Sequence, residues 1–242
     1  MDYGKVFLEF CRRSTEWKAC LAWVAEQPLT SRNKIQRVLS VGAGDGSFDR
    51  EWLVHLPEMQ HYVALEPYAS HFDELKQRFA EDARAEIIQS GFEGFESGSS
   101  FDLIVFAHSL YYMKDREKQL QRARAMLKPG GQCWVFHQTE RGIHEIQQRF
   151  GDAKTQQYSL TAENIAQALT GLGVSYVSTE LPATIDVRNA PKDLVDFFLE
   201  RDTTPDEYAR VGQFLREHGP YLDHPVCALT FKANENMSSL AS

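Results

Sequence analysis

The chain has few cysteines, and they lack the spacing that metal sites require. Cys11, Cys20, Cys133 and Cys227 are spread over 242 residues. They form no Cys-x-x-Cys pair, and no cluster of cysteine and histidine has zinc spacing. We therefore predict four buried thiols and no metal site.

Long apolar runs are also missing. No stretch approaches the roughly 20 apolar residues of a membrane span. The start of the chain, "MDYGKVFLEFCRR", has an acid at position 2 and no apolar segment before a small-residue cleavage site, which is unlike a secretory signal. We expect a cytoplasmic protein with no membrane partner.

A basic surface is absent too. The formal net charge is −8, which repels phosphate backbones, and no basic stripe with interleaved aromatic residues is present. Nucleic acid is therefore not the expected partner. We expect a small-molecule substrate and a monomeric protein.

The apolar pattern that is present alternates between strands and helices. Strands are expected at residues 37–42, 61–66, 85–89, 101–107, 132–136, 174–180 and 226–233. Helices are expected within 2–27, ended by Pro28, and at 48–56, 71–83, 116–127, 139–151, 161–173, 191–201 and 204–218, with Pro129-Gly130-Gly131 stopping the helix at 116–127. Such alternation predicts an α/β fold: a Rossmann-like, mostly parallel sheet of seven strands with helices on both faces.

These elements predict one domain over residues 1–232 and a disordered tail over 233–242. The N-terminal helices, within residues 1–30, and a C-terminal helical insert at about 184–225 are expected to cover the ligand site.

Three glycines follow the first strand in "RVLSVGAGDGSFD". Gly42, Gly44 and Gly46 indicate a ligand held against the main chain, at the carboxyl end of the strand. A dinucleotide site would have glycine at position 47, where this chain has Ser47. Asp45 at the helix entrance would repel phosphate but attract a sulfonium. The loop therefore favours S-adenosylmethionine as the cofactor.

Other residues fit the same cofactor. Glu66 ends the second strand, twenty positions after Gly46, where a carboxylate can accept hydrogen bonds from ribose hydroxyls. Gln89 and Ser90 are expected to bind the adenine. Phe92 is either an apolar face for the adenine or part of the core. A glycine-rich turn without a ligand and a nicotinamide-dependent oxidoreductase are the alternatives.

The chain resembles class I S-adenosylmethionine-dependent methyltransferases, and within them the histamine N-methyltransferase family. Besides the glycine loop, the resemblance rests on short motifs along nearly the whole chain. These are "DYGK" (2–5), "STE" (14–16), "EP" (66–67), "LYYMKD" (110–115), "QYSLTAENI" (157–165), "LGVSY" (172–176) and "DLVDFF" (193–198). Ser40, together with the later Asp49, replaces the acid that many such enzymes have two residues before the first glycine.

The resemblance implies roles for particular residues. Gly42, Glu66, His71, Ser90 and Ala107 would contact the cofactor, and we place His108 there as well. Glu16 would anchor the acceptor. His108 falls where the family has a glutamine, and His224 where it has an asparagine near the acceptor nitrogen. Phe10, Tyr111, Tyr112, Ile143 and Gln147 are assigned to the acceptor pocket. Ile143 and Gln147 replace two tryptophans of the family, so the acceptor need not be histamine.

The resulting hypothesis is an N-methyltransferase for a small amine or imidazole-containing molecule. His108 would take a proton from the attacking nitrogen, with Glu16 and His224 as the other catalytic residues. Each role has an alternative: His108 as a strand-end residue, Glu16 as a helix-start acid that serves the Ser14 cap or is simply solvated, and the two tyrosines as packing. The alternative functions are an O- or S-methyltransferase, or a non-catalytic binder of S-adenosylhomocysteine.

Overall fold

The computed structural model describes residues 3–28 and 34–233 of the chain. Contacts divide the chain into two compact units. Among the described residues, unit 1 consists of 3–20, 137–165 and 179–227. Unit 2 consists of 21–28, 34–136, 166–178 and 228–233. Residues 3–20 and 184–225 of the expected cover both belong to unit 1.

All seven expected strands form, and they make one sheet with the order β3-β2-β1-β4-β5-β9-β6. Their bounds are β1 (Arg37–Val41), β2 (His61–Leu65), β3 (Ala85–Ile88), β4 (Phe101–Ala107), β5 (Leu127–Gln138), β6 (Tyr176–Leu181) and β9 (Val226–Lys232). β1 is parallel to β2 and β4, and the pairs β2–β3 and β4–β5 are also parallel. The predicted mostly parallel, Rossmann-like sheet is confirmed.

The order of strands brings two loops together at one edge of this sheet. From β1 the chain continues to β2 and β3 on one side and then returns to the other side at β4. The loops after β1 and β4 are therefore neighbours at the point where strand order reverses, which is where ligands bind in such sheets. A Cβ on Gly42, after β1, would lie 2.6 Å from Cβ of Ser109, after β4.

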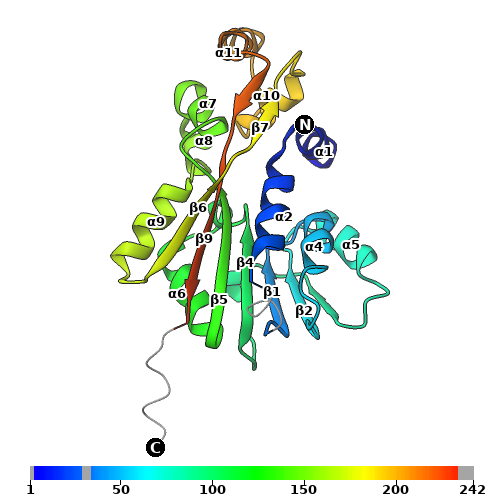
Figure 1. Cartoon of the computed structure of the whole chain (residues 1–242). Helices are drawn as coiled ribbons and strands as arrows, with labels where there is room; N and C mark the ends of the chain where they lie inside the picture. Colours follow the sequence, from blue (N-terminus) through cyan, green and yellow to red (C-terminus); the bar gives the residue numbers. More distant parts are fainter. Residues whose placement is uncertain (1–2, 29–33, 234–242) are drawn as a thin grey trace, which may run out of the picture. The chain divides into compact units, whose positions relative to one another are not determined.

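Helices in unit 2 connect these strands. They are α4 (Ser47–Leu53), α5 (Ala69–Arg78) and α6 (Arg116–Met126), with short 3-10 helices η1 (Phe92–Gly94) and η2 (Leu110–Tyr112). Figure 1 shows α4 and α5 beside β1 and β2. The helix expected at 116–127 forms as α6 and ends at Met126, before Pro129-Gly130-Gly131, but β5 begins at Leu127 and not at the expected Gln132. The proline and glycines lie where the register between β4 and β5 shifts.

Unit 1 holds most of the remaining elements. They are α1 (Tyr3–Arg13), α7 (Ile143–Phe150), α8 (Ala153–Gln157), α10 (Lys192–Phe198), α11 (Pro205–His218), β7 (Thr184–Asp186) and β8 (Tyr221–Asp223). Helices α2 (Glu16–Glu26) and α9 (Ala162–Gly171) carry residues of both units. β7 and β8 pair antiparallel. These two strands and α8 have three to five residues each, too few to show a periodic pattern in the sequence.

The helix expected at residues 139–151 begins late, at Ile143. Gly142 before it has φ 72°, and a Cβ there would lie 2.7 Å from both Asp223 O and His224 Nδ1. Close packing against the end of β8 and the residue after it therefore sets this helix start. The apolar side of α7 joins α1, α10, α11, β7 and β8 in one buried core.

Two other expectations need correction. Ala233, expected in the tail, is 7% exposed, and its N–H donates to Gly131 O at 3.1 Å; residues 234–242 lie outside the described part. Cys20, Cys133 and Cys227 are buried, but Cys11 is only partly so.

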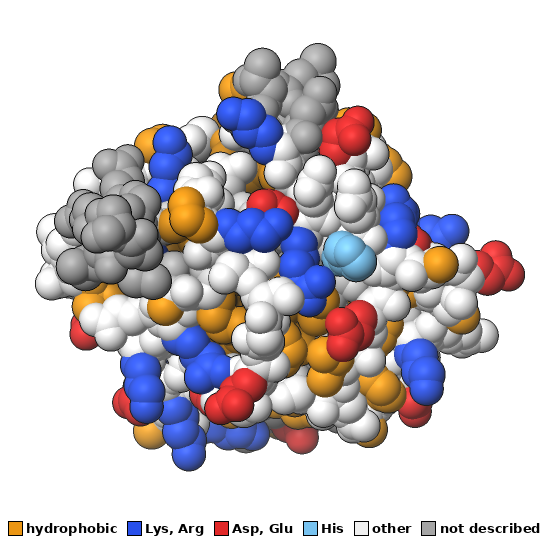
Figure 2. Space-filling model, turned by 90° about the horizontal axis from the view of Figure 1, so that it is seen from below, with side chains coloured by type: hydrophobic (Ala, Val, Ile, Leu, Met, Phe, Trp, Pro, Cys, Tyr) orange, Lys and Arg blue, Asp and Glu red, His pale blue; other side chains and the backbone are white. Residues whose placement is uncertain are grey.

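Charge is mixed on the face that Figure 2 shows, where Lys and Arg side chains lie among Asp and Glu side chains. In the described ranges, no helix is both long and apolar enough to cross a membrane. Over the same residues, no group of three or more His, Cys, Asp or Glu side chains is placed to hold a metal ion.

Candidate functional site

The glycine loop after β1 is fixed by the end of β2. Gly42, Gly44 and Gly46 have φ values of 70°, 59° and 76°, which side chains disfavour. The N–H groups of Gly42 and Ala43 donate to Leu65 O at 2.9 and 3.0 Å. The Gly44 N–H donates to Oε2 of Glu66 at 2.9 Å. These three bonds tie the loop to the end of β2 and to Glu66.

The three glycines differ in what surrounds them. A Cβ on Gly46 would lie 2.5 Å from Leu75 Cδ1 and 2.9 Å from Phe79 Cε2. A Cβ on Gly44 would meet no atom within 4 Å. Gly46 and Gly42 are thus required by packing, whereas Gly44 leaves open space beside the backbone.

Glu66 follows the last residue of β2 and is 3% exposed. Its Oε1 accepts from the Tyr68 N–H at 3.0 Å, and its Oε2 accepts from Gly44. Since each carboxylate oxygen has two lone-pair directions, both oxygens retain capacity for a further donor. This agrees with the predicted role of holding ribose hydroxyls.

Asp45, which was expected to attract the sulfonium, forms an ion pair within the protein. Its Oδ2 lies 2.7 Å from Nη2 of Arg78, at the end of α5, and Ser47 donates to the same carboxylate from N–H and hydroxyl. Because Arg78 neutralises this carboxylate, Asp45 attracts a sulfonium less than its charge alone would, and its contact with the cofactor stays a prediction.

The pair Ser40 and Asp49, singled out by the resemblance, lies in the core of unit 2. Both are 2% exposed. Asp49 accepts from Trp52 Nε1 at 2.9 Å and from the Tyr62 hydroxyl, and it is hydrogen-bonded to Ser40. Burial raises the pKa of Asp49, although these hydrogen bonds act in the opposite direction. The pair therefore joins β1, β2 and α4 beneath the glycine loop.

The other predicted cofactor residues also follow strand ends in unit 2. Gln89 and Ser90 follow β3, with Gln89 exposed and Ser90 partly buried. Ala107 ends β4, and His108 comes next with φ 49°; its N–H donates to Phe136 O at 3.0 Å. Phe92 is 1% exposed and packs against Phe106, so it is a core residue.

Aromatic rings line this edge of the sheet. The Tyr111 and Tyr112 ring centroids are 4.3 Å apart. Tyr68 lies 6.3 Å from Tyr112 and 6.4 Å from His71. Tyr68 is 56% exposed and was not predicted from the sequence. Its position two residues after Glu66 was the available signal.

A second group of predicted residues meets inside unit 1. Nε2 of His224 lies 3.4 Å from Oε2 of Glu16, and Nδ1 accepts from the Ile143 N–H at 3.4 Å. The ring hydrogen therefore lies on Nε2 and faces Glu16. Phe10 packs edge-on against the imidazole at 6.3 Å. Glu16 is 2% exposed, so the solvated alternative is wrong; Ser14 Oγ accepts from its N–H at 3.1 Å.

Gln147 and Ile143 make contacts inside unit 1. Gln147 Nε2 donates to Phe198 O at 3.0 Å, and Oε1 lies 3.5 Å from Nε2 of Gln138. Ile143 belongs to the apolar core. Their predicted contact with the acceptor stays a prediction.

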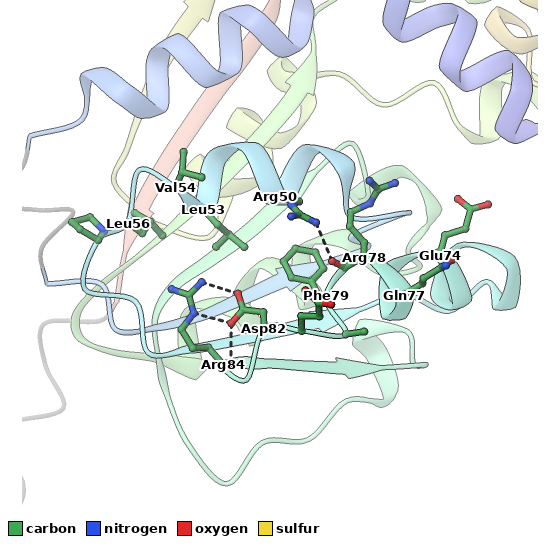
Figure 3. A pocket seen from close by; sticks show the side chains of 13 residues that line it. Arg50, Leu53, Val54, Leu56, Glu74, Gln77, Arg78, Phe79, Asp82 and Arg84 are labelled. Atoms are coloured by element: carbon green, nitrogen blue, oxygen red, sulfur yellow. Dashed lines mark hydrogen bonds and ion pairs between the residues drawn. The ribbon is translucent and has the colours of Figure 1, made fainter.

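A cavity of about 960 Å³ lies in unit 2 between the ends of α4 and α5. It is lined by Arg50, Leu53, Val54, Leu56, Pro57, Glu74, Gln77, Arg78, Phe79, Ala80, Glu81, Asp82 and Arg84. Figure 3 shows Arg50 reaching the main chain of Arg78, and Arg84 paired with Asp82. None of the predicted site residues lines this cavity. Its relation to the site is through Arg78, which holds Asp45.

The glycine edge fits S-adenosylmethionine. Ser109, against Gly42, is 5% exposed, and within the described part of the chain its hydroxyl has no hydrogen-bond partner. Such a buried polar atom is costly unless a ligand or water satisfies it. With the open side of Gly44 and the carboxylate of Glu66, it supplies polar groups and space for the cofactor.

Comparison with known proteins agrees with this geometry. A family model described as a methyltransferase domain matches residues 39–133. The tRNA U34 carboxymethyltransferase of Haemophilus ducreyi is 27% identical over 132 residues, covering 53% of this chain and 41% of that protein. The chain thus matches less than half the length of this relative.

Solved structures share the fold. The N-methyltransferase NodS from Bradyrhizobium japonicum aligns with a TM-score of 0.54 at 15% identity, covering 85% of this chain and 93% of that one. The plantazolicin methyltransferase BpumL, in complex with a substrate analog and S-adenosylhomocysteine (SAH), aligns with a TM-score of 0.62 at 14% identity, covering 96% and 91%. Residues 39–133 thus match a methyltransferase domain, and the chain shares its fold with solved class I methyltransferases.

Proposed function

We propose that this protein is an S-adenosylmethionine-dependent methyltransferase and that it transfers a methyl group to a nitrogen of a small amine or imidazole-containing molecule, as the resemblance to histamine N-methyltransferases implies. The observation that carries the proposal is the Glu16–His224 pair in unit 1. A buried carboxylate beside an imidazole and the Phe10 ring is complementary to an organic cation or to an N–H group.

The rings of Phe10 and its neighbours support this reading. Phe10 and Phe197 have ring centroids 5.3 Å apart, and Phe7 lies 6.4 Å from each of them. Glu16 itself is 2% exposed, and burial away from water strengthens the attraction of its carboxylate for a cation. Glu16 would accept hydrogen bonds from the acceptor, and His224 would hold the carboxylate in place.

When bound, S-adenosylmethionine supplies an activated methyl group that a nitrogen lone pair can take. The glycine loop and Glu66 hold the cofactor, with Gln89 and Ser90 at the adenine. Correct placement of the nitrogen then accounts for much of the rate, because orientation alone can lower a barrier by roughly 7–11 kcal/mol.

His108 is the proposed acceptor of the proton that the nitrogen gives up. Its main chain is fixed at the carboxyl end of β4 by the bond to Phe136. A histidine titrates near neutral pH, at about 6.5 when unperturbed, which suits this role.

The test is a methyl-transfer assay with product identification by mass spectrometry, using histamine and a panel of amines chosen by thermal shift in the presence of SAH. We expect a methylated nitrogen in at least one product, with SAH formed in equal amount. Glu16→Gln is expected to reduce this turnover, and Glu9→Gln serves as the control on α1.

The same assay separates the competing hypotheses. Because the chain is similar to a tRNA U34 carboxymethyltransferase, tRNA must be included among the acceptors in the assay. The net charge of −8 disfavours binding of tRNA. Methyl transfer only to tRNA, or only to hydroxyl or thiol compounds, would refute the proposal. Tight SAH binding without turnover on any acceptor would indicate a non-catalytic binder and would refute it as well.

A further inference from the structure

The end of α5 holds the centre of the glycine loop through one arginine. Arg78 Nε donates to the main-chain oxygen of Asp45 at 2.7 Å, and Nη2 donates to Oδ2 of the same residue at 2.7 Å. The guanidinium therefore binds both the backbone and the side chain of Asp45. Such a planar fork restricts geometry more than a single ammonium does.

Leu75 and Phe79, which are close to Arg78 in the sequence, pack against Gly46, the next residue of the loop. Leu75 and Phe79 lie where a Cβ on Gly46 would be. Leu75 and Arg78 in the last turn of α5, and Phe79 directly after it, lie on one side, as spacings of three and four residues require. Asp45 and Gly46 are thus held from α5, while Gly44 is held from Glu66.

An ion pair at the surface contributes little to the stability of a protein. Exposed pairs contribute about 0–1 kcal/mol to stability, and the Arg78 and Asp45 side chains are 32% and 19% exposed. Two features of this pair indicate a role in cofactor binding as well as in stability. It engages the main chain of the cofactor loop, and it neutralises the only carboxylate within the loop Gly42–Gly46.

The charge matters because the cofactor and its product differ in charge. S-adenosylmethionine carries a sulfonium cation, whereas SAH is a neutral thioether at the same atom. A bare carboxylate in the loop would favour the cofactor by Coulomb attraction, and a bare guanidinium would disfavour it. With both groups paired, the loop adds little to this discrimination.

We propose that Arg78 is a positioning residue for the cofactor: it holds the glycine loop through the Asp45 main chain, and it masks the Asp45 charge, so that the loop does not favour S-adenosylmethionine over SAH unless the pair is broken. The inference goes beyond the proposed function, because it concerns the cofactor alone and needs no acceptor.

The test is isothermal titration of both ligands with variants of the full chain. Arg78→Met is expected to raise the Kd for SAH at least fivefold, because the loop loses its hold. The Kd for S-adenosylmethionine should rise less, so that the ratio Kd(SAH)/Kd(S-adenosylmethionine) increases at least threefold. Asp45→Asn should shift this ratio in the opposite direction, because Arg78 is then unmasked. The double variant should return the ratio to the wild-type value.

A matched control lies on the same cavity. Arg84 Nη2 pairs with Asp82 Oδ2 at 2.7 Å, the distance of the Arg78–Asp45 pair, but Arg84 binds both carboxylate oxygens of Asp82 and no residue of the glycine loop (Figure 3). Arg84→Met should leave both dissociation constants within twofold of wild type. Equal effects of Arg78→Met and Arg84→Met would show a general charge effect and overturn the proposal.

Two further results would also overturn it: dissociation constants within twofold of wild type in Arg78→Met, or an unchanged ratio in both single variants. Should Arg78→Met fail to fold, Arg78→Lys keeps the charge but cannot make the forked contact. It is expected to weaken both ligands by a similar factor and leave their ratio unchanged. A Lys variant with wild-type affinities would contradict the positioning role.

Discussion

His224 Nε2 lies 3.4 Å from Glu16 Oε2, and their side chains are only 1% and 3% exposed. The Ile143 N–H fixes the other ring nitrogen, so the imidazole is directed at the carboxylate. Removing one member of such a buried pair typically costs about 3–5 kcal/mol, because the other is left without compensation. Tests of function at this pair therefore require conservative substitutions.

Glu16→Gln keeps an oxygen that can accept from His224 but removes the negative charge. If Glu16 binds the acceptor, kcat/KM for the amine should fall about tenfold or more, since charge-assisted hydrogen bonds contribute about 1.5–3 kcal/mol. The Kd for SAH should stay within twofold. Titration calorimetry and steady-state kinetics measure the two effects. Equal losses for both ligands would instead mean that the N-terminal segment has a purely structural role.

Gly44→Ala and Gly46→Ala separate ligand space from packing. Both residues have positive φ, so each alanine costs about 1–2 kcal/mol in the backbone. Only Gly46→Ala also clashes with Leu75 and Phe79, and its Tm should fall further. Gly44→Ala has room in the protein, and it should weaken SAH binding by more than its loss of stability explains. Normal SAH affinity in folded Gly44→Ala would place the cofactor elsewhere.

Glu66→Ala should abolish measurable SAH binding at micromolar protein. The substitution removes the acceptor predicted for the ribose and also the bond that holds the Gly44 N–H. Glu66→Gln keeps an acceptor for Gly44, and it should lose about tenfold or more in affinity through the missing charge. Calorimetry with thermal denaturation as the folding control decides this. A folded Glu66→Ala variant with the wild-type Kd would remove Glu66 from the site.

Much of the sheet could be predicted from the sequence, because buried parallel strands are continuous apolar runs. "VLSV" in β1 and "IVF" in β4 are of this kind, and both were placed correctly. The glycine loop followed from Gly42, Gly44 and Gly46, since the pattern is local. Boundaries failed where tertiary packing decides them, as at Gly142 before α7 or at the shift of register near Gly131.

Long-range pairing was the part that sequence reasoning could not supply. Asp45 and Arg78 are thirty-three positions apart, and no local pattern shows that α5 neutralises the loop. Glu16 and His224 lie at opposite ends of the chain, and only the resemblance brought both into the same prediction. Tyr68 was missed because an exposed tyrosine has no periodic signal. Each of these depends on which surfaces the fold brings together.

His108 should determine the acidic limb of the pH profile if it takes the proton from the attacking nitrogen. We expect kcat/KM to fall below a pH near the reference value for histidine, about 6.5. His108→Gln should remove or displace this limb. Two acceptors of different pKa distinguish the cases, because a limb that follows the acceptor belongs to the acceptor. A variant with wild-type activity and pH profile would leave positioning as the only catalytic contribution there.

Glu200 should make stability depend on pH in an unusual direction. It has φ 54°, and burial raises its pKa from 4.5 to about 7. Between these values the folded state binds the proton and the unfolded state does not, so stability falls as pH rises from about 4.5 to 7 and is then constant. Glu200→Gln removes the ionisation, and it should raise Tm at pH 8 by more than at pH 5.

The control for Glu200 is a neighbouring acid with the opposite shift. Hydrogen bonds from Arg201 and Thr204 lower the pKa of Glu207 to about 2, so this group stabilises the fold above its ordinary pKa and loses that contribution as pH falls toward 2. Glu207→Gln should therefore lower Tm at pH 8, with a smaller effect as the pH is lowered. Differential scanning calorimetry of both variants at several pH values tests the two signs together. A Glu200→Gln variant whose Tm differs from wild type by the same amount at pH 5 and pH 8 would show that Glu200 is ionised throughout and that its burial does not disfavour the charge.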